Sequence, residues 1–391
     1  MTEATSPLSS PPSSAVSSPV PGSQHLVLLG AGHAHVQVLV ALAAQPLPGT
    51  TVTLVAPYPR QLYSGMVPGF MAGHYTLEQC VIPLEPLVKR SGIRWIAQSG
   101  GAVDAPNQTV QLDDGSSLRF DWLSVNTGPT QDRARIEREI PGAREHALFV
   151  RPIEAFTALW PRVAAMGDAR ALRVTVIGGG AGGIELALAV RHRLPNAAVT
   201  LLCGQTPPGA NYPAPVQQRL LAILKRRQVT VLQDTAVALT GSAVQLGCGA
   251  DLACDVPLLA AGAQAPAWLA HSGLALDDQG FIAVDSYQRS TSHNRVFAAG
   301  DVSTRMDRPL ARSGVYAVRA GAALAHNLAA ATTGGALKAH QPPVNTLNLL
   351  SCGDRYAVGT WGSFSAQGRT LWWLKDWIDR RFMARYQDAK T

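Results

Sequence analysis

The feature that most constrains this chain is a glycine-rich turn that the sequence contains twice, each time after a short apolar run. The first copy follows the apolar residues Leu26-Val-Leu-Leu29 and has glycine at Gly30 and Gly32. Glycine has no side chain to keep such a turn away from a ligand, and a helical apolar pattern from Val36 to Leu42 follows directly. Because the start of a helix offers free backbone N–H groups, this unit is expected to bind a pyrophosphate.

The second copy carries the complete dinucleotide fingerprint. It follows the apolar run Val174 to Ile177 and precedes a helix expected over Ile184 to Arg193. Its three glycines are Gly178, Gly180 and Gly183. The first copy departs from the fingerprint because His35 stands where the third glycine is expected. One turn of this kind is weak evidence, but its repetition predicts two nucleotide-binding units.

Each turn is followed by a second strand that lacks the acidic residue often used to hold a ribose. The strand from Thr51 ends in Ala56-Pro57, and the strand from Ala198 ends in Cys203. The ribose contacts must therefore come from the backbone or from elsewhere. No arginine follows Cys203 at once, so this strand end favours neither NADH nor NADPH.

Three more strand ends carry candidate binding residues. The strand Trp122 to Val125 and the segment Pro257 to Pro266 end in glycine-containing links, which we interpret as crossings between domains. The strand Val296 to Ala299 ends in an Asp that can accept hydrogen bonds from a ribityl hydroxyl, although Asp also caps helices well. Two nucleotide units upstream favour the cofactor interpretation. The candidates are Thr127, Gly128, Gly262, Gly300 and Asp301.

Two histidines flank the start of the first helix and are candidate binding residues. His33 and His35 have no further ligands nearby in the sequence that would complete a metal site. The positive end of a helix also disfavours a charged imidazolium. We therefore expect neutral rings that pack beside the phosphates and make hydrogen bonds.

The segment Tyr63 to Tyr75 is too rich in glycine for a stable helix and too apolar for an exposed loop. It is either a buried connector or a segment that lines an apolar ring pocket.

The last part of the chain contains an amphipathic pattern. Leu371, Leu374, Ile378 and Phe382 recur at helical spacing, Trp373 and Trp377 lie beside that stripe, and basic residues interleave. Residues 371–383 are therefore expected to form a helix. Its apolar face could lie in a bilayer interface, pack on its own domain or contact a second subunit, as in a homodimer.

Composition excludes several classes of protein. The net charge is +7, but the basic residues are scattered and form no run with interleaved aromatic residues, so nucleic acid is a poor candidate partner. The five cysteines form no C-x-x-C pair, which argues against a disulfide framework, a metal site and a dithiol centre. A reducing, cytoplasmic compartment is expected. Residues 1–23 lack the basic start and apolar core of a secretory signal.

These motifs resemble the two-dinucleotide-domain flavoproteins of the pyridine nucleotide-disulfide oxidoreductase superfamily, over nearly everything after Gln24. Within it, the chain is most similar to the type II NADH dehydrogenase and sulfide:quinone oxidoreductase branch. It is more similar still to the oxidoreductase module fused to selenide, water dikinase in some bacteria. The stretches that carry this similarity are Gly32-His-Ala-His-Val36, Leu62-Tyr-Ser-Gly-Met66, Ser290-Thr-Ser-His293, Val296-Phe-Ala-Ala-Gly-Asp301 and Lys375-Asp-Trp-Ile-Asp-Arg-Arg-Phe-Met383.

The resemblance implies an α/β fold with two Rossmann-like dinucleotide-binding domains, the second inserted in the first, and a small C-terminal α+β region. The expected division is a disordered tail at 1–23, an FAD-binding domain at 24–150 and 269–335, an NAD(P)-binding domain at 151–268, and a C-terminal region at 336–391.

The resemblance also implies roles for individual residues. Gly30, Gly32 and Asp301 would bind FAD, and the three glycines of the second turn would face NADH or NADPH. Glu185 would lie near the nicotinamide ring, as the catalytic candidate. The segment Tyr63 to Pro68 would line the flavin and the quinone pocket.

The expected activity is FAD-dependent oxidation of NADH or NADPH with direct electron transfer to a quinone-like acceptor, in the cytoplasm or at the inner face of the membrane. A sulfide- or selenide-oxidising enzyme is an alternative that requires thiols near the flavin, and Cys80 and Cys352 are the only candidates. Each is better explained as an inert apolar filler. A redox sensor with slow turnover is a third alternative.

Overall fold

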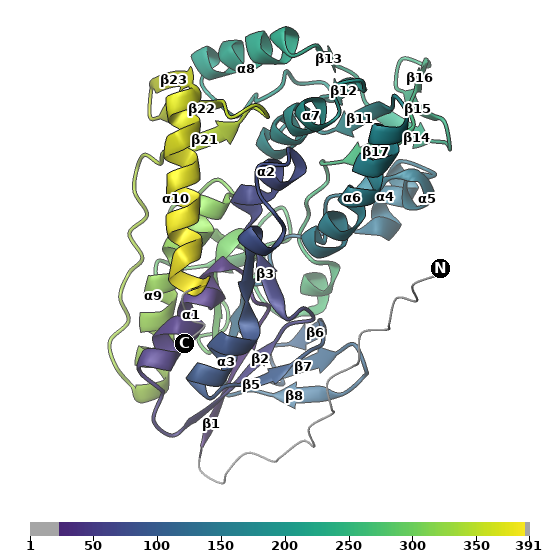
Figure 1. Cartoon of the computed structure of the whole chain (residues 1–391). Coiled ribbons are helices and arrows are strands. Elements are labelled where there is room, and N and C mark those ends of the chain that lie inside the picture. The colour runs from purple at the N-terminus through teal and green to yellow at the C-terminus, as the bar shows by residue number, and fades with distance from the viewer. Residues whose placement is uncertain (1–22, 388–391) are drawn as a thin grey trace, which may run out of the picture.

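The computed structural model describes residues 23–387, so the tail expected at 1–23 lies outside the described residues except for Ser23. The first unit is a five-stranded parallel sheet in the order β19-β9-β1-β2-β5. Figure 1 labels β1, β2 and β5 of this sheet. Its strands are β1 Gln24–Leu29, β2 Thr50–Val55, β5 Arg94–Ile96, β9 Trp122–Val125 and β19 Val296–Ala298. Because β19 follows β9 only after a long excursion of the chain, this unit is interrupted.

The interruption contains a second five-stranded parallel sheet, in the order β10-β17-β11-β12-β13. Its strands are β10 Leu148–Phe149, β11 Arg173–Ile177, β12 Ala198–Leu202, β13 Val229–Leu232 and β17 Val256–Leu259. The predicted α/β fold, with a second Rossmann-like unit inserted in the first, is therefore confirmed.

Smaller sheets accompany the two parallel ones. Three are antiparallel and three-stranded: β6 Gly100–Asp104, β7 Thr109–Leu112 and β8 Ser117–Arg119; β14 Ala236–Leu239, β15 Ala243–Leu246 and β16 Asp251–Ala253; β21 Asn348–Ser351, β22 Ala357–Trp361 and β23 Phe364–Gly368. Two pairs complete the set: β3 Arg60–Leu62 with β4 Val81–Pro83, and β18 Ile282–Val284 with β20 Ser303–Arg305. Strands β7 and β8 form an antiparallel hairpin.

The helices follow the strands as a doubly wound fold requires. They are α1 His33–Ala44, α2 Val67–Met71, α3 Leu84–Ser91, α4 Arg133–Glu139, α5 Ala143–His146, α6 Ile153–Ala169, α7 Ala181–Arg193, α8 Ala214–Arg226, α9 Gly314–Thr333 and α10 Arg369–Gln387. Single 3₁₀ turns span Ser64–Met66, Glu78–Cys80, Ala267–His271 and Gly300–Val302. The two glycine turns join β1 to α1 and β11 to α7.

The apolar run of β1 is buried on both faces of its sheet. Leu26 and Leu28 belong to the core that includes α1, α9 and α10, whereas Val27 and Leu29 belong to the core on the opposite face. Continuous burial of this kind is typical of a parallel strand covered on both sides. It explains why the sequence shows an unbroken apolar run before the turn.

The expectation that Tyr63 to Tyr75 is too glycine-rich for a helix is wrong. The chain there forms a 3₁₀ turn and then α2, whose Val67 and Met71 are buried in the core of the second unit. Gly69 is needed inside this helix because a Cβ atom at that position would overlap the ring of Tyr75. A close contact between helix and ring therefore explains the glycine.

The C-terminal helix α10 packs on its own chain, alongside α1, α9 and β21–β23 (Figure 1). The predicted apolar stripe is correct in part: Phe382 is buried, but Leu374 is 37% exposed, and the buried face also carries Trp372, Lys375 and Asp379. Lys375 and Asp379 are buried as an ion pair. Two charged residues that neutralise each other resemble surface residues in a sequence, which is why the pattern did not place Lys375 and Asp379 on the buried face.

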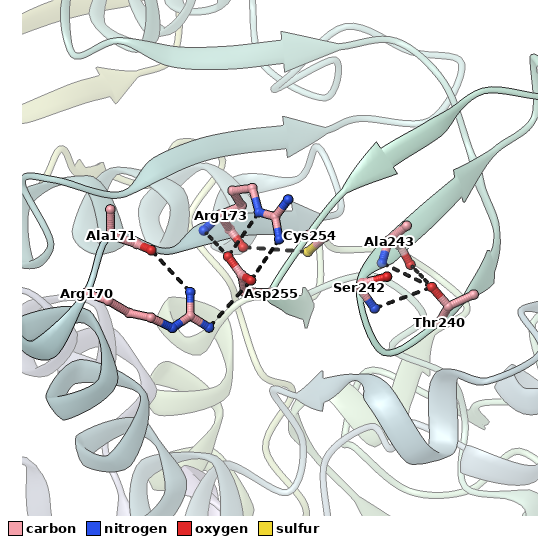
Figure 2. A network of polar contacts seen from close by, with 8 residues as sticks. All are labelled: Arg170, Ala171, Arg173, Thr240, Ser242, Ala243, Cys254 and Asp255. Carbon is pink, nitrogen blue, oxygen red and sulfur yellow. Dashed lines mark hydrogen bonds and ion pairs between the residues drawn. The ribbon is translucent and has the colours of Figure 1, made fainter.

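A polar network fixes the second sheet at the end of β11 opposite to its glycine turn (Figure 2). Asp255 accepts hydrogen bonds from the backbone N–H of Arg173 at 2.8 Å and from the Arg173 guanidinium, and it also pairs with Arg170. These contacts hold the pKa of Asp255 well below its usual range. The network aligns β11 with the segment that enters β17. Because it lies at the end of β11 away from the glycine turn, we assign it a structural role.

Candidate functional site

The first glycine turn is built around one buried side chain, the amide of Asn126. Gly30 has φ +85°, and a Cβ atom at Gly30 or Gly32 would overlap Asn126. A Cβ at Gly300 would lie 2.8 Å from Asn126 Nδ2, which donates a hydrogen bond to Ala299 O at 2.5 Å. Asn126 thus ties the glycine turn to the Gly-Asp strand end. Sequence reasoning missed it, and its only signal was a polar residue at the end of an apolar strand.

The same amide occupies part of the N-terminus of α1. Asn126 Oδ1 accepts hydrogen bonds from the N–H groups of Ala34 and His35, both at 3.1 Å. Within residues 23–387, the N–H groups of Ala31 and His33 have no partner. They lie at the positive end of the helix dipole, so an anionic group is the ligand that they fit.

His35 has a structural role in this turn. The ring is fully buried, with Nδ1 at 2.5 Å from Gly30 O and Nε2 at 2.8 Å from Ser124 Oγ. Burial lowers the pKa of His35 to about 4, so the ring is neutral at physiological pH. Since both ring nitrogens bind protein atoms, His35 has no nitrogen left for a cofactor.

His33 is different because its Nε2 is buried and has no hydrogen-bond partner within the described part of the chain. Its ring meets the edge of Tyr63, with centroids 5.5 Å apart, and Phe382 lies near both. Burial, and secondly the charge of Arg151, lowers the pKa of His33 to about 4. A neutral ring with one unpaired nitrogen beside the free N–H groups remains available to a ligand.

Two charged side chains converge on this turn without pairing. Asp301 is largely buried, and in the described residues its carboxylate makes no hydrogen bond or ion pair. Burial raises the pKa of Asp301, while the nearby charges of Arg151 and Arg312 oppose the rise. Among the described residues the Arg151 guanidinium forms no ion pair either, although the charges of Asp301 and Glu154 oppose the lowering of its pKa by burial. Arg151 was not among the candidates from the sequence.

A small cavity adjoins Asp301, between the strand end at Gly300 and the N-terminal half of α9 at Tyr316. Gln288 lines it, and the buried Gln288 Oε1 has no partner in the structure as described. Free N–H donors, an unpaired arginine and a buried carboxylate complement a pyrophosphate and a polyol chain. The residues present therefore fit FAD.

The second glycine turn has open space at Gly180, whereas Asn126 occupies the corresponding space at Gly32 in the first turn. Gly178 has φ +134°, and a Cβ atom at Gly183 would overlap Gly178 O, so both positions need glycine. A Cβ at Gly180 would meet no atom within 4 Å. This turn leaves its backbone accessible, as a site for an exchanging nucleotide requires.

Glu185 lies on α7, two residues after Gly183. Its Oε1 accepts a hydrogen bond from the backbone N–H of Ser351 at 2.7 Å. Burial raises the pKa of Glu185 to about 7, and the charge of Lys375 opposes the rise. Glu185 therefore exchanges a proton near neutral pH and joins the second unit to the C-terminal region.

The two predicted domain crossings lie side by side. Gly128 and Gly262 both have positive φ, and Thr130 pairs with Gln264 in an antiparallel bridge directly beyond them. Thr127 makes only a long contact, from its Oγ1 to Gly128 O at 3.4 Å. The crossings thus form a double link between the units.

The two candidate thiols, Cys80 and Cys352, are unsuited to redox chemistry because both are buried. All five cysteines are free, and burial raises the pKa of both Cys80 and Cys352 to about 12. In the part of the chain that the structure describes, no group of three or more His, Cys, Asp or Glu side chains could hold a metal ion.

The sequence matches the family model described as Pyridine nucleotide-disulphide oxidoreductase over residues 24–326. A sulfide-quinone reductase of Aquifex aeolicus is 28% identical over 109 residues, which are 27% of this chain and 24% of that protein. A NADH dehydrogenase-like protein of Mycobacterium tuberculosis, MT1860, is 25% identical over 307 residues, 72% of this chain and 74% of that protein. The chain thus spans about a quarter of the length of the first of these relatives and about three quarters of the length of the second.

Among solved structures, NDH2 from Plasmodium falciparum in complex with NADH superimposes with a TM-score of 0.77, at 12% identity, over 93% of this chain and 97% of that one. The likeness of fold therefore extends over both units and the C-terminal region.

Proposed function

Because the chain belongs to the pyridine nucleotide-disulphide oxidoreductase family, we propose that it is an FAD-dependent enzyme that oxidises NADH or NADPH and reduces a quinone-like acceptor. The observation that carries the proposal is the pair of glycine turns, one with unpaired polar groups around it and one with an open backbone. The similar proteins named as NADH dehydrogenase-like and as sulfide-quinone reductase support the donor and the acceptor class.

We assign FAD to residues 24–150 and 269–335. The N–H groups of Ala31 and His33 would bind the pyrophosphate, Arg151 would neutralise it, and Asp301 would accept hydrogen bonds from the ribityl chain. Gly30, Gly32 and Gly300 would keep the backbone close to the cofactor. When bound, FAD accepts two electrons from the nicotinamide and passes them to the acceptor.

We assign the nicotinamide nucleotide to residues 151–268. Gly178, Gly180 and Gly183 would let the start of α7 approach the pyrophosphate of NADH or NADPH. Glu185, one turn further along α7, would lie on the nicotinamide side, where its raised pKa supports proton exchange.

The thiols argue against a sulfide- or selenide-oxidising enzyme that works through cysteine. Cys80 and Cys352 are buried, and their raised pKa values keep them protonated at neutral pH. Direct electron transfer to the acceptor, close to the segment Tyr63 to Pro68, is therefore the better-supported route.

We also propose that the C-terminal region contacts a lipid surface. Trp373 and Trp377 on α10 are 61% and 57% exposed, and Trp361 and Phe364 at the β22–β23 turn are 61% and 79% exposed. Arg381 lies over the Trp377 ring, so a cation adjoins the aromatic side chains. Tryptophan beside arginine is typical of a membrane interface. No helix between residues 23 and 387 is long and apolar enough to cross a bilayer.

Vesicle flotation tests the lipid contact. The protein should float with anionic vesicles, and Trp373→Ala with Trp377→Ala should abolish flotation. A dimer that dissociates in the same double variant, without flotation of the wild type, would instead identify a second subunit as the partner of this face.

Steady-state turnover tests the activity. Purified protein should oxidise NADH or NADPH at a rate that depends on an added soluble quinone. A protein that is reduced by NADH but does not turn over with quinone would be a redox sensor rather than this enzyme.

A further inference from the structure

Gln131 lies directly after the bridge that joins the two crossings, and its side chain reaches into the second unit. The side chain is buried. Gln131 Nε2 donates hydrogen bonds to Leu259 O at 2.9 Å and to Ala261 O at 2.7 Å. Gln131 Oε1 accepts one from the backbone N–H of Arg151 at 2.8 Å. The amide therefore joins two backbone segments of the second unit, one at the end of β17 and one directly before α6.

The segment at the end of β17 lies against the second glycine turn. The N–H groups of Ala260 and Ala261 both donate to Ile177 O, at the end of β11, at 2.9 Å. A Cβ atom at Gly178 would lie 2.9 Å from Ala261 N. Because this segment is held by β11 and packs on the turn, it gives the Gln131 amide a fixed support.

The other partner of Gln131 is the residue whose charge acts on the first glycine turn. The bond to Gln131 is the only hydrogen bond of Arg151 among residues 23–387. The charge of the half-buried Arg151 lowers the pKa of His33, in addition to burial, and opposes the rise in the pKa of Asp301. The titratable groups that face Arg151 are His33, Glu154 and Asp301. Gln131 thus connects a support in the second unit to a cation beside the first turn.

A link between the two units does not by itself require Gln131. The crossings are already joined by backbone hydrogen bonds, from Thr130 N to Gln264 O at 2.9 Å and from Gln264 N to Thr130 O at 2.8 Å. What Gln131 adds is the connection to Arg151, which no other hydrogen bond fixes within the described part of the chain. A long cationic side chain loses conformational freedom when it binds a ligand, so a fixed backbone lowers the cost of placing its charge.

We propose that Gln131 is a positioning residue for the FAD pyrophosphate and that it acts through Arg151. Gln131 fixes the Arg151 backbone to the support at the end of β17, which keeps the guanidinium beside the first glycine turn. A cation from the start of the second unit thereby completes an anion site in the first unit. The inference rests on the proposed function, in which the first turn binds FAD and Arg151 neutralises its pyrophosphate.

A second buried amide provides a matched control. Asn327 Nδ2 donates to Tyr287 O at 2.8 Å and to Lys338 O at 3.0 Å, and Asn327 Oδ1 accepts from the N–H of Lys338 at 2.7 Å. Asn327 therefore makes the same three kinds of bond to the backbone as Gln131, without a contact to Arg151. Gln131→Met and Asn327→Leu each remove three hydrogen bonds and keep a side chain of similar size.

Equilibrium dialysis measures FAD affinity in these variants, in Arg151→Met and in the Gln131→Met/Arg151→Met double variant. Arg151→Met should weaken FAD binding roughly tenfold to a hundredfold, as expected for a lost charge-assisted hydrogen bond, and Gln131→Met roughly tenfold. The double variant should bind FAD within about twofold of Arg151→Met alone, because the two residues act as one unit. Asn327→Leu should bind FAD within about twofold of wild type, although its thermal stability should fall as much as that of Gln131→Met.

Two pKa values in the FAD-free protein test the role without the cofactor. Displacement of the Arg151 charge should raise the pKa of His33 and also that of Asp301, since a nearby cation lowers both. Water that enters a merely loosened turn would raise the pKa of His33 but lower that of Asp301, because burial shifts the two in opposite directions. NMR titration of the ring and carboxyl signals separates these cases. Both values should rise in Gln131→Met, and neither should change in Asn327→Leu.

Wild-type FAD affinity in Gln131→Met, additive losses in the double variant, or a fall in the pKa of Asp301 would overturn the inference. An equal loss of FAD affinity in Asn327→Leu would also overturn it. If Gln131→Met does not fold, Gln131→Asn decides the question, because its amide is one methylene too short to keep all three partners and should also weaken FAD binding. A wild type that binds no FAD would instead contradict the proposed function, while the two pKa values would still test the placement of Arg151.

Discussion

The two glycine turns solve the same packing problem with different residues. In the second turn, a Cβ atom at Gly183 would overlap Gly178 O, so only glycine lets helix and strand pack closely. In the first turn, His35 holds the corresponding position, and its Nδ1 lies 2.5 Å from Gly30 O. In the second unit the carbonyl of Gly178 lies against the backbone of Gly183. In the first unit the corresponding carbonyl, that of Gly30, is hydrogen-bonded to the buried His35 ring. The third glycine of the fingerprint therefore serves helix–strand spacing rather than ligand contact.

The turns also differ at the start of their helices. The first is partly capped by Asn126, and its remaining donors face the unpaired Arg151 and Asp301. The second has open space around Gly180. The first turn, whose polar groups are already held in place by Asn126, suits a cofactor that stays bound. The second turn, with open space around Gly180, suits a nucleotide that binds and dissociates.

The largest effect is expected from Gly32→Val, because the new side chain would overlap Asn126 and close the first turn. FAD affinity should fall at least about 100-fold, or about 2.8 kcal/mol. Equilibrium dialysis of the folded protein measures it. The matched variant Gly180→Ala has space for its methyl group and should keep FAD while raising the KM for NADH. Loss of FAD from Gly180→Ala would break the distinction between the turns.

The next effect is a loss of stability in acid. His33 and His35 have pKa values near 4 in the folded chain and near the ordinary 6.5 when unfolded. Between these values the unfolded chain binds protons that the folded chain does not, so the free energy of unfolding should fall as pH drops from 6.5 to 4. Urea unfolding at several pH values measures the slope. His35→Gln should flatten it, and an unchanged slope would contradict the buried neutral ring.

A smaller effect is expected from Asn126→Ala, which leaves the N–H groups of Ala34 and His35 without an acceptor. Unsatisfied buried donors of this kind cost about 1–3 kcal/mol. Thermal unfolding measures the loss. Asn126→Asp retains the acceptor and should recover part of it, whereas equal losses in both variants would show that the cap is unimportant.

The smallest effect concerns FAD affinity in His35→Gly, which gives the first turn the same fingerprint as the second. Since the described partners of the His35 ring nitrogens are Gly30 O and Ser124 Oγ, FAD affinity should stay within about twofold of wild type, or about 0.4 kcal/mol. The variant should still unfold at lower temperature. A tenfold loss of affinity would mean that the ring contacts the cofactor.

The parts of this molecule that the sequence predicted are those set by local pattern. The apolar runs before Gly30 and Gly178 form the expected strands, and the acidic strand end at Asp301 lies beside the first turn. These features need only a few consecutive residues. Asn126 and Arg151 were missed because their importance arises from residues distant in the chain, which no local pattern reveals.

The C-terminal helix α10 shows what hydrophobic spacing in the sequence cannot predict. Its helical period was visible in the sequence, but the pattern did not place Lys375 and Asp379 on the buried face, where they pair with each other and Asp379 accepts a hydrogen bond from Tyr63. Hydrophobic spacing identifies a helix, whereas a buried polar cluster is recognised only once its partners are in place.

Anaerobic titration of the purified protein with NADH, followed in the visible flavin band, tests the central claim most directly. We expect a yellow protein with one FAD per chain, whose flavin band bleaches on addition of NADH or NADPH. A folded, colourless protein that takes up no FAD when it is offered would contradict it.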